Sequence, residues 1–323
     1  MGCPLVTAVA AAVGLVVLGA PEARAQAWTP PKGEASVDVG YAFDTADEHI
    51  DSQGNVMTVP SGQGWGTMTW NDAALNLGYG ITDRWAVRVG LPFVVSKYEG
   101  QVPHPPMPGH QNQDDGKWYD TFGDFAAEVR FKTTLGSFVV TPLLGLTVPS
   151  HSYEFYAHAA AGRGLTEGRV GVNVGRLLDP LLPNAYAQVR YVFSVPERPL
   201  GIWHNRSNLS WDVGYLVTKA LTIDTIGEWE KTHGGWRAPV DFPMDQNFLY
   251  HDQLQRSDYI RLGGGISYAL SGSVEVAAMA YTSLHVRSEV NMGGVALNFT
   301  YSFSPAQAIR KRQGPPGRPP RPS

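Results

Sequence analysis

The chain has 323 residues, of which 43% are hydrophobic and 17% are charged, and its formal net charge is -4. This mild negative charge argues against nucleic acid as a partner, because nucleic-acid-binding proteins present an excess of Lys and Arg. After its first residues the chain has no stretch that approaches the roughly 20 consecutive apolar residues of a membrane-spanning helix, which excludes a bundle of helices in lipid.

The N-terminal segment has the pattern of a secretory signal peptide. Residues 5–18 form an apolar run that is too short to span a bilayer, and Ala23 and Ala25 form a small-x-small cleavage motif before Gln26. We therefore expect a signal peptide at 1–25, although no Lys or Arg precedes the apolar run. Cys3 is the only cysteine and would leave with this peptide. A mature chain without thiols fits an oxidising compartment.

From residue 34 onward, apolar residues alternate with small or polar residues about twelve times. In the last of these runs, Val295, Leu297 and Phe299 alternate with Ala296 and Asn298. A period of two places one set on each face of a strand. The second face is rich in Gly and Ala, whereas a soluble sheet would show Lys, Glu and Thr to water. This pattern is typical of a strand that separates lipid from a narrow aqueous lumen.

Bounded by turn residues, the alternation predicts twelve strands. In chain order they cover 34–44, 66–81, 83–97, 119–134, 137–149, 167–177, 184–195, 208–218, 220–231, 257–270, 272–285 and 290–303. The connections alternate between long and short, as in outer-membrane barrels, which have short periplasmic turns and longer extracellular loops. The sequence therefore predicts an all-β fold, a closed antiparallel transmembrane β-barrel of about twelve strands over 26–303. An even strand number places both termini in the periplasm.

Aromatic and proline residues refine this prediction. Pro92 and Pro142 each remove a ladder hydrogen bond, so we expect them at bulges or strand ends.

After Phe303, residues 304–323 are rich in Pro and Arg, which predicts a disordered periplasmic tail. Aromatic residues favour strands in general, but ten of them fall near predicted strand ends, as two interfacial girdles would: Tyr79, Trp85, Tyr98, Tyr191, Phe193, Trp211, Trp229, Tyr268, Tyr301 and Phe303.

Three pieces of the chain resemble a known family. They are Tyr79-Gly80-Ile81-Thr82-Asp83-Arg84-Trp85 with Gly90-Leu91-Pro92-Phe93, then Gly123-Asp124 at the start of a strand, and Leu146-Thr147-Val148-Pro149 at the end of one. These strand-and-turn patterns resemble the outer-membrane family named after the MetA pathway of phenol degradation, across most of the barrel. The resemblance implies a barrel that passes small, often aromatic or hydrophobic, compounds and has no catalytic residues.

Catalytic and metal sites are not indicated by the residue spacing. His151-Ser152 and the segment from His204 to Ser210 come nearest to a nucleophile and base, but no Ser and His lie two apart on one strand face. We therefore expect no enzyme, no catalytic residue and no cofactor.

All nine histidines fall in predicted long loops or at their edges: His49, His104, His110, His151, His158, His204, His233, His251 and His285. The simpler interpretation is that they are solvated loop residues. A transition-metal site outside the membrane is the alternative hypothesis, since imidazole is a usual ligand. The spacing of His104 and His110 matches no metal motif, so we expect no metal.

Charged residues on the predicted lumen face are unevenly distributed and are the predicted pore-lining residues. The third, fourth and sixth strands contribute Arg88, Arg130, Lys132 and Arg169, with Glu128 as the exception, and the eighth and ninth contribute Asp212, Asp224, Glu228 and Glu230. In a barrel of twelve strands these groups lie on opposite walls. They predict either a pore with a transverse field or a salt-bridge network that fills the lumen.

The functional prediction is a passive channel for small solutes, hydrophobic or aromatic compounds among them, in a bacterial outer membrane. Its expected partners are the lipid bilayer and the solute. Two alternatives remain open. One is a surface barrel with a plugged lumen, whose extracellular loops bind a partner. The other is a soluble secreted β-protein. Conductance would separate the first two functions, and fractionation with the outer membrane would separate both from the third.

Overall fold

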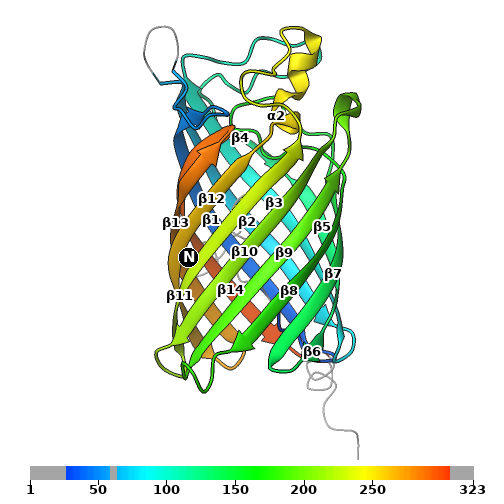
Figure 1. Ribbon diagram of the computed structural model, residues 1–323, viewed down its shortest axis with the longest axis vertical. Helices are drawn as coiled ribbons and strands as arrows, with labels where there is room; N and C mark the ends of the chain where they lie inside the picture. Colours follow the sequence, from blue (N-terminus) through cyan, green and yellow to red (C-terminus); the bar gives the residue numbers. More distant parts are fainter. Residues whose placement is uncertain (1–26, 59–63, 306–323) are drawn as a thin grey trace, which may run out of the picture.

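The computed structural model describes residues 27–58 and 64–305, so the predicted signal peptide and nearly all of the predicted tail lie outside the described residues. The strands form one antiparallel sheet that closes on itself (Figure 1). Strand β1 (Ala35–Ile50) pairs with β2 (Gly66–Gly80) on one side and with the last strand, β14 (Glu289–Phe303), on the other. The predicted closed antiparallel β-barrel is confirmed.

The barrel has twelve strands, because β4 (Tyr119–Phe122), β5 (Asp124–Phe131) and β6 (Thr133–Leu135) are consecutive pieces of one. Each strand falls where the alternation predicts it, although β1 and β10 extend further toward the long loops. The remaining strands are β3 (Trp85–Gly100), β7 (Phe138–Pro149), β8 (Glu167–Leu177), β9 (Ala185–Pro196), β10 (His204–Leu216), β11 (Leu221–Gly234), β12 (Asp258–Ser271) and β13 (Val274–Arg287).

Short helical turns occur only in the connections between the described strands. They are η1 (Pro199–Gly201), η2 (Gln246–Tyr250) and α2 (His251–Leu254), and α2 lies over the end of the barrel that carries the long loops (Figure 1). Among the described residues, no helix is long and apolar enough to cross a membrane.

The two prolines interrupt the ladder in different ways. Along β3, Phe93 pairs with Phe122 but Gly90 pairs with Ala126, so the partner strand contains one extra residue. This is a β-bulge at Gly123, whose N–H donates to the Pro92 carbonyl at 2.9 Å. The bulge expected at Pro92 is present. Pro142 lies inside β7 between the stretches paired with β5 and β6, without a bulge and away from a strand end.

Connection lengths follow the predicted alternation except that the connection at 178–184, at the short-turn end, is as long as the loop at 197–203, and that the connection between β13 and β14 is short. Short turns join the strands at one end of the barrel, for example at 136–137 and 272–273, and long loops lie at the other end at 51–65, 101–118, 150–166, 197–203 and 235–257. The connection between β13 and β14 was predicted to be long but is a single residue, Ser288, which has a φ of 47°. The two strands continue past their predicted ends until they nearly meet.

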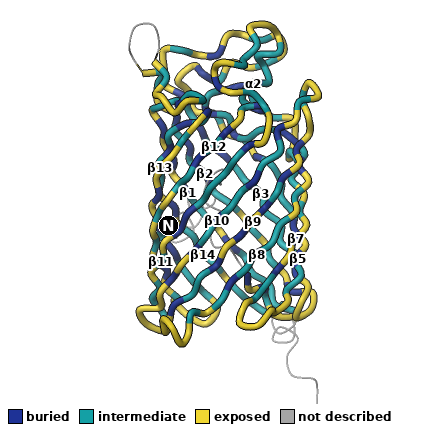
Figure 2. The backbone as a smooth tube through the Cα atoms, viewed as in Figure 1, coloured by how far each residue is buried: buried dark blue, intermediate teal, exposed yellow. Residues whose placement is uncertain are grey.

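The outer face is apolar, as a lipid-facing surface requires. Figure 2 shows exposed positions recurring along the strands. Tyr79, Trp85, Tyr268 and Tyr301 are exposed at strand ends beside the short turns, where a girdle would lie. Tyr98 is an exception to the predicted girdles, because it is fully buried inside the barrel. The large apolar residues that are exposed on the strands include Val39, Leu75, Leu77, Val129, Leu144, Leu146, Val170, Val189, Val213, Ile223, Ile266, Val295, Leu297 and Phe299.

A hydrophobic core lies inside the barrel at the long-loop end, where the sequence predicts a polar inner face. Met68 and Trp70 of β2 and Tyr98 of β3 pack there with Ala159 and Ala161 of the loop at 150–166. The alternation still places these strand residues inward, but their partner is a folded loop instead of water. The core therefore fixes this loop within the mouth of the barrel.

Candidate functional site

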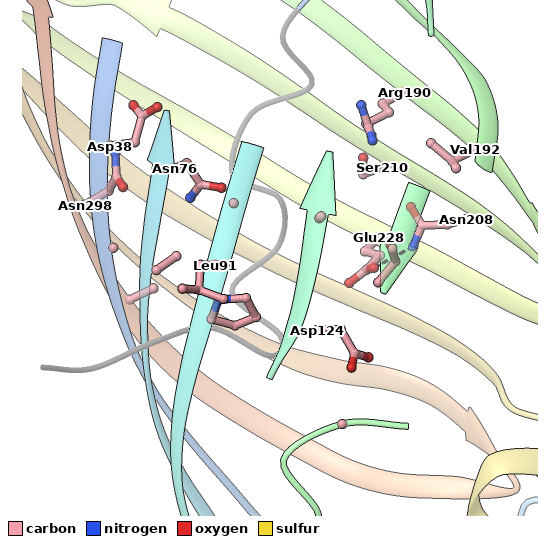
Figure 3. A pocket seen from close by; sticks show the side chains of 18 of the residues that line it. Asp38, Asn76, Leu91, Asp124, Arg190, Val192, Asn208, Ser210, Glu228 and Asn298 are labelled. Atoms are coloured by element: carbon pink, nitrogen blue, oxygen red, sulfur yellow. Dashed lines mark hydrogen bonds between the residues drawn. The ribbon is translucent and has the colours of Figure 1, made fainter. Parts of the chain in front are cut away.

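The lumen contains a cavity of about 960 Å³. Its lining begins at Ser271–Val274, the turn between β12 and β13, and reaches Asp252 and Gln253 in α2 at the opposite end. Figure 3 shows Asn76 and Asn298 on one side of the cavity and Arg190 and Glu228 on another. One polar cavity thus extends over most of the height of the barrel, and the long loops meet it at one end.

The structure places six of the nine predicted pore-lining residues on this cavity: Arg88, Glu128, Arg130, Arg169, Glu228 and Glu230. The other three do not line it. Asp212 is 1% exposed and accepts hydrogen bonds from the Tyr186 hydroxyl at 3.1 Å and from Gln188 Nε2 at 3.2 Å. Asp224 lies over Gly265, and Lys132 lies at the break between β5 and β6.

Glu128 is the centre of a cluster of arginines. Its Oε2 lies 2.6 Å from Arg130 Nη2, and its Oε1 lies 2.5 Å from Arg190 Nη2 and 3.6 Å from Arg169 Nη2. Arg88 is the cross-strand partner of Glu128 in the ladder between β3 and β5. The cluster therefore gathers three guanidinium groups round one carboxylate, with Arg88 opposite it in the ladder.

Gly145 explains how Glu128 and Arg169 meet across an intervening strand. It pairs with Glu128 on one side and with Arg169 on the other. A Cβ on Gly145 would lie 3.2 Å from Arg169 Nε and 3.3 Å from Glu128 Cγ, closer than most side-chain contacts. A larger residue would push apart the two charged groups.

The predicted acidic wall also carries arginines. Glu228 is the cross-strand partner of Arg261, whose Nη1 lies 3.8 Å from its Oε2. Glu230 Oε1 lies 3.5 Å from Nη2 of Arg163, which belongs to the loop at 150–166. Cross-strand pairing and a loop residue therefore bring arginine to these acids, as the predicted alternative of a salt-bridge network would.

Some of these arginines could have been found in the sequence. Arg190 has the same inward parity as Gln188 in its predicted strand, and Arg261 has the parity of Gly263, so the alternation itself placed both in the lumen. Arg163 carried no such signal. It lies in a loop, and only the folding of that loop into the mouth brings it to Glu230.

The first described residues lie inside the barrel near the short turns. The N–H of Ala27 donates to Gln188 Oε1 at 3.0 Å, and its carbonyl accepts from Thr141 Oγ1 at 2.6 Å. The Trp28 ring meets Tyr186 edge-on with a centroid distance of 6.4 Å. A Cβ on Gly175 would lie 2.7 Å from the Ala27 Cβ. This segment therefore occupies the space beside the inward-facing Gly175.

The loop at 150–166 folds inward and is anchored to the wall. Its Ala159 carbonyl accepts from Ser96 Oγ at 2.5 Å, and its Tyr153 hydroxyl donates to Asp124 Oδ1 at 2.6 Å. The Arg163 carbonyl accepts from Gln253 Nε2 of α2 at 2.6 Å. This loop and α2 together cover the mouth of the cavity.

The histidines lie at this same end, but not all in loops. His49, His204 and His233 belong to strands, because β1, β10 and β11 extend beyond their predicted ends, and His285, the last residue of its predicted strand, lies in β13. His110 Nδ1 contacts Glu154 Oε1 at 2.9 Å and does not approach His104.

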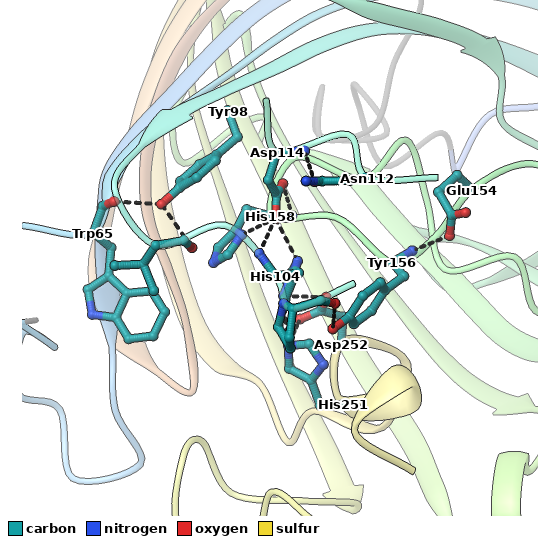
Figure 4. A network of polar contacts seen from close by, with 12 residues as sticks. Trp65, Tyr98, His104, Asn112, Asp114, Glu154, Tyr156, His158, His251 and Asp252 are labelled. Atoms are coloured by element: carbon teal, nitrogen blue, oxygen red, sulfur yellow. Dashed lines mark hydrogen bonds and ion pairs between the residues drawn. The ribbon is translucent and has the colours of Figure 1, made fainter. Parts of the chain in front are cut away.

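Three histidines from three loops form a cluster with two aspartates, shown in Figure 4. The His104 and His158 rings stack with a centroid distance of 4.0 Å, and His104 Nε2 lies 3.1 Å from His251 Nε2. Burial lowers the pKa of His158 and of His251, which favours neutral imidazoles. Burial raises the pKa of Asp114, but the imidazoles of His104 and His158 outweigh this effect and hold that pKa below its ordinary value.

Comparison with solved structures identifies the fold. The COG4313 outer membrane channel from Pseudomonas putida F1 is similar, with a TM-score of 0.64 and 13% identity over 89% of this chain and 100% of that one. Two further matches score too low to carry an argument. The KdgM porin in complex with disordered oligogalacturonate has a TM-score of 0.43 and 11% identity over 83% of this chain and 99% of that one. The NalP translocator domain from Neisseria meningitidis has a TM-score of 0.43 and 8% identity over 84% and 88%.

The sequence matches no protein-family model and no curated protein. The similarity to the COG4313 channel shows that the protein has the fold of a bacterial outer-membrane channel. The fold implied by the family resemblance is confirmed.

Proposed function

We propose that the protein is a passive channel of the bacterial outer membrane for small solutes. The observation that carries this proposal is the cavity of about 960 Å³ that runs from a short turn to the loops at the opposite end. A closed sheet with an apolar outer face surrounds this cavity, so a solute inside it is separated from lipid. The long loops then face the cell exterior and the short turns face the periplasm.

The arginine cluster at Glu128 bears on which solutes pass. Three guanidinium groups round one carboxylate, with Arg88 on the same cavity wall, leave a positive potential there, and a confined low-dielectric surround strengthens it. We infer that small anions, including carboxylates with an aromatic or aliphatic body, pass more readily than cations of the same size.

Conductance across a planar bilayer tests both statements. The wild-type barrel is expected to conduct, with a preference for anions. Arg88→Glu should shift the reversal potential toward cation selectivity, because it reverses one charge on the cavity wall. Arg84→Glu makes the same charge change at an exposed position in a short turn and should leave selectivity nearer to wild type. Equal shifts in the two variants would show that Arg88 does not line the conduction path.

A plugged barrel with partner-binding loops is the second candidate, and the inward loop at 150–166 favours it. That loop packs Ala159 and Ala161 into a hydrophobic core with the wall, which holds the loop inside the barrel. Replacing residues 154–163 with a short Gly-Ser linker distinguishes the candidates. A wild-type barrel that is silent, beside a variant that conducts, would establish the plug and overturn the channel.

A further inference from the structure

Two long loops bring three metal-ligating groups together above the cavity. His104 belongs to the loop at 101–118, whereas His251 and Asp252 begin α2. His251 Nε2 lies 3.1 Å from His104 Nε2 and 3.1 Å from Asp252 Oδ1, and His104 Nε2 lies 3.8 Å from Asp252 Oδ2. Both imidazole rings are buried, and Asp252 lines the cavity.

Neighbouring oxygens assign the proton on each imidazole. His251 Nδ1 lies 2.7 Å from the carbonyl oxygen of Phe248, which can only accept, so Nδ1 carries the proton and Nε2 carries a lone pair. His104 Nδ1 lies 2.8 Å from Asp114 Oδ2, although without the alignment of a regular hydrogen bond. A carboxylate also only accepts, so this contact favours the tautomer with the proton on Nδ1, in which His104 too presents a lone pair on Nε2.

Two lone pairs and a carboxylate therefore point at one another. Nitrogen lone pairs 3.1 Å apart repel, and Asp252 adds negative charge beside them. Its Oδ2 is buried and accepts no hydrogen bond from a described residue. A cation between the three groups, either an additional proton on an imidazole or a metal ion, would neutralise this arrangement.

The distances between the three groups fit a metal ion. In a tetrahedral site with bonds of about 2.0 to 2.1 Å, ligand atoms lie about 3.4 Å from one another. The distances of 3.1, 3.1 and 3.8 Å lie close to that value, and because the two imidazoles approach different oxygens of Asp252, a rotation of its carboxylate would bring one oxygen to both. The hydrogen bond from His251 to Phe248 and the contact of His104 with Asp114 are the outer-shell partners that orient metal-bound imidazoles.

We propose that His104, His251 and Asp252 bind one divalent transition-metal ion of the zinc type, with its fourth position open toward the cavity. Two imidazoles and one carboxylate suit zinc and similar ions, whereas calcium and magnesium take oxygen ligands. Bound there, the ion links the loop at 101–118 to α2 and holds both over the mouth of the barrel. No sequence motif could indicate this site, because its histidines are 147 residues apart.

Calorimetric titration of Zn²⁺ into the purified, chelator-treated full-length barrel tests the site. We expect one Zn²⁺ per chain, with at least tenfold weaker binding in His251→Gln and in Asp252→Asn. The control is His285→Gln, which removes an exposed histidine and should bind as wild type does. Heat-modifiable migration on a gel establishes that each variant is folded. Binding that is absent, or equally strong in His251→Gln and His285→Gln, would overturn the site.

Two further measurements address coordination and the link between loops. Co²⁺ in place of Zn²⁺ should give the intense visible bands of a tetrahedral ion in wild type and not in His251→Gln; a weak octahedral spectrum would contradict the proposed geometry. Zn²⁺ should also slow trypsin cleavage at the exposed Arg237 and Arg256, which flank α2, in wild type but not in His251→Gln. Cleavage that Zn²⁺ does not slow would contradict the link between the loops.

Discussion

Glu128 illustrates how single residues organise the lumen. Its carboxylate is 6% exposed and is shared by Arg130, Arg169 and Arg190. Charges removed from bulk water are stable only when they are paired and hydrogen-bonded, and this one carboxylate pairs with three guanidinium groups. Glu128, the one acidic residue among the predicted basic ones, therefore neutralises part of the positive charge of these arginines.

Glu128→Gln should lower the free energy of unfolding by about 3 kcal/mol, because it removes the buried carboxylate that three arginines share. The measurement is the urea midpoint of the refolded barrel in detergent. Glu99→Gln is the matched control, since Glu99 is exposed and pairs with Lys97 at 2.7 Å. Its cost should be below about 1 kcal/mol. Similar losses in both variants would show that the cluster contributes no more than a surface pair.

Strand β14 shows how one element faces two solvents. Leu297 is 56% exposed on the outer face, while its neighbour Asn298 lines the cavity (Figure 3). The alternation gives each residue a fixed face, because successive side chains of a strand point in opposite directions. A slip of the register by one residue would place the apolar set in the lumen.

Leu297→Arg should therefore reduce barrel assembly much more than Asn298→Arg. A charged side chain near the bilayer midplane costs about 2 to 4 kcal/mol, whereas a lumen position is already polar. Heat-modifiable migration after refolding into lipid vesicles measures the folded fraction of each variant. If Asn298→Arg impaired folding as strongly as Leu297→Arg, the assignment of the two faces would be wrong.

At the scale of the whole molecule, the asymmetry of the connections sets its orientation. The long loops, their inward-folded part at 150–166 and α2 all lie at one end, and the short turns lie at the other (Figure 1). Since outer-membrane barrels expose long loops to the exterior, the mouth covered by loops should face outward.

An epitope inserted after Gly109, an exposed residue of the loop at 101–118, should be labelled by antibody on intact cells. The same epitope inserted after Gly136, in the short turn between β6 and β7, should be labelled only after the outer membrane is opened. The reverse labelling pattern would invert the proposed orientation.

The sequence by itself determined the strands, the faces of each strand and the closed barrel. These follow from a local period of two, which any lipid-exposed strand must satisfy because its backbone geometry alternates side chains. The inward parity of Arg88, Glu128 and Glu228 was set in the same way.

Only the tertiary structure decided which of these groups meet. Arg190 pairs with Glu128 although 62 positions separate them in the sequence, and His251 contacts His104 across 147 positions. Strand order and register bring the first pair together, and the inward folding of loops brings the second. Loop residues have no period that fixes their direction, so packing of side chains such as Ala159 against Trp70 determines where the loops lie. The hydrophobic core in the mouth and the histidine cluster above the cavity therefore arise from contacts between distant segments, which no local pattern encodes.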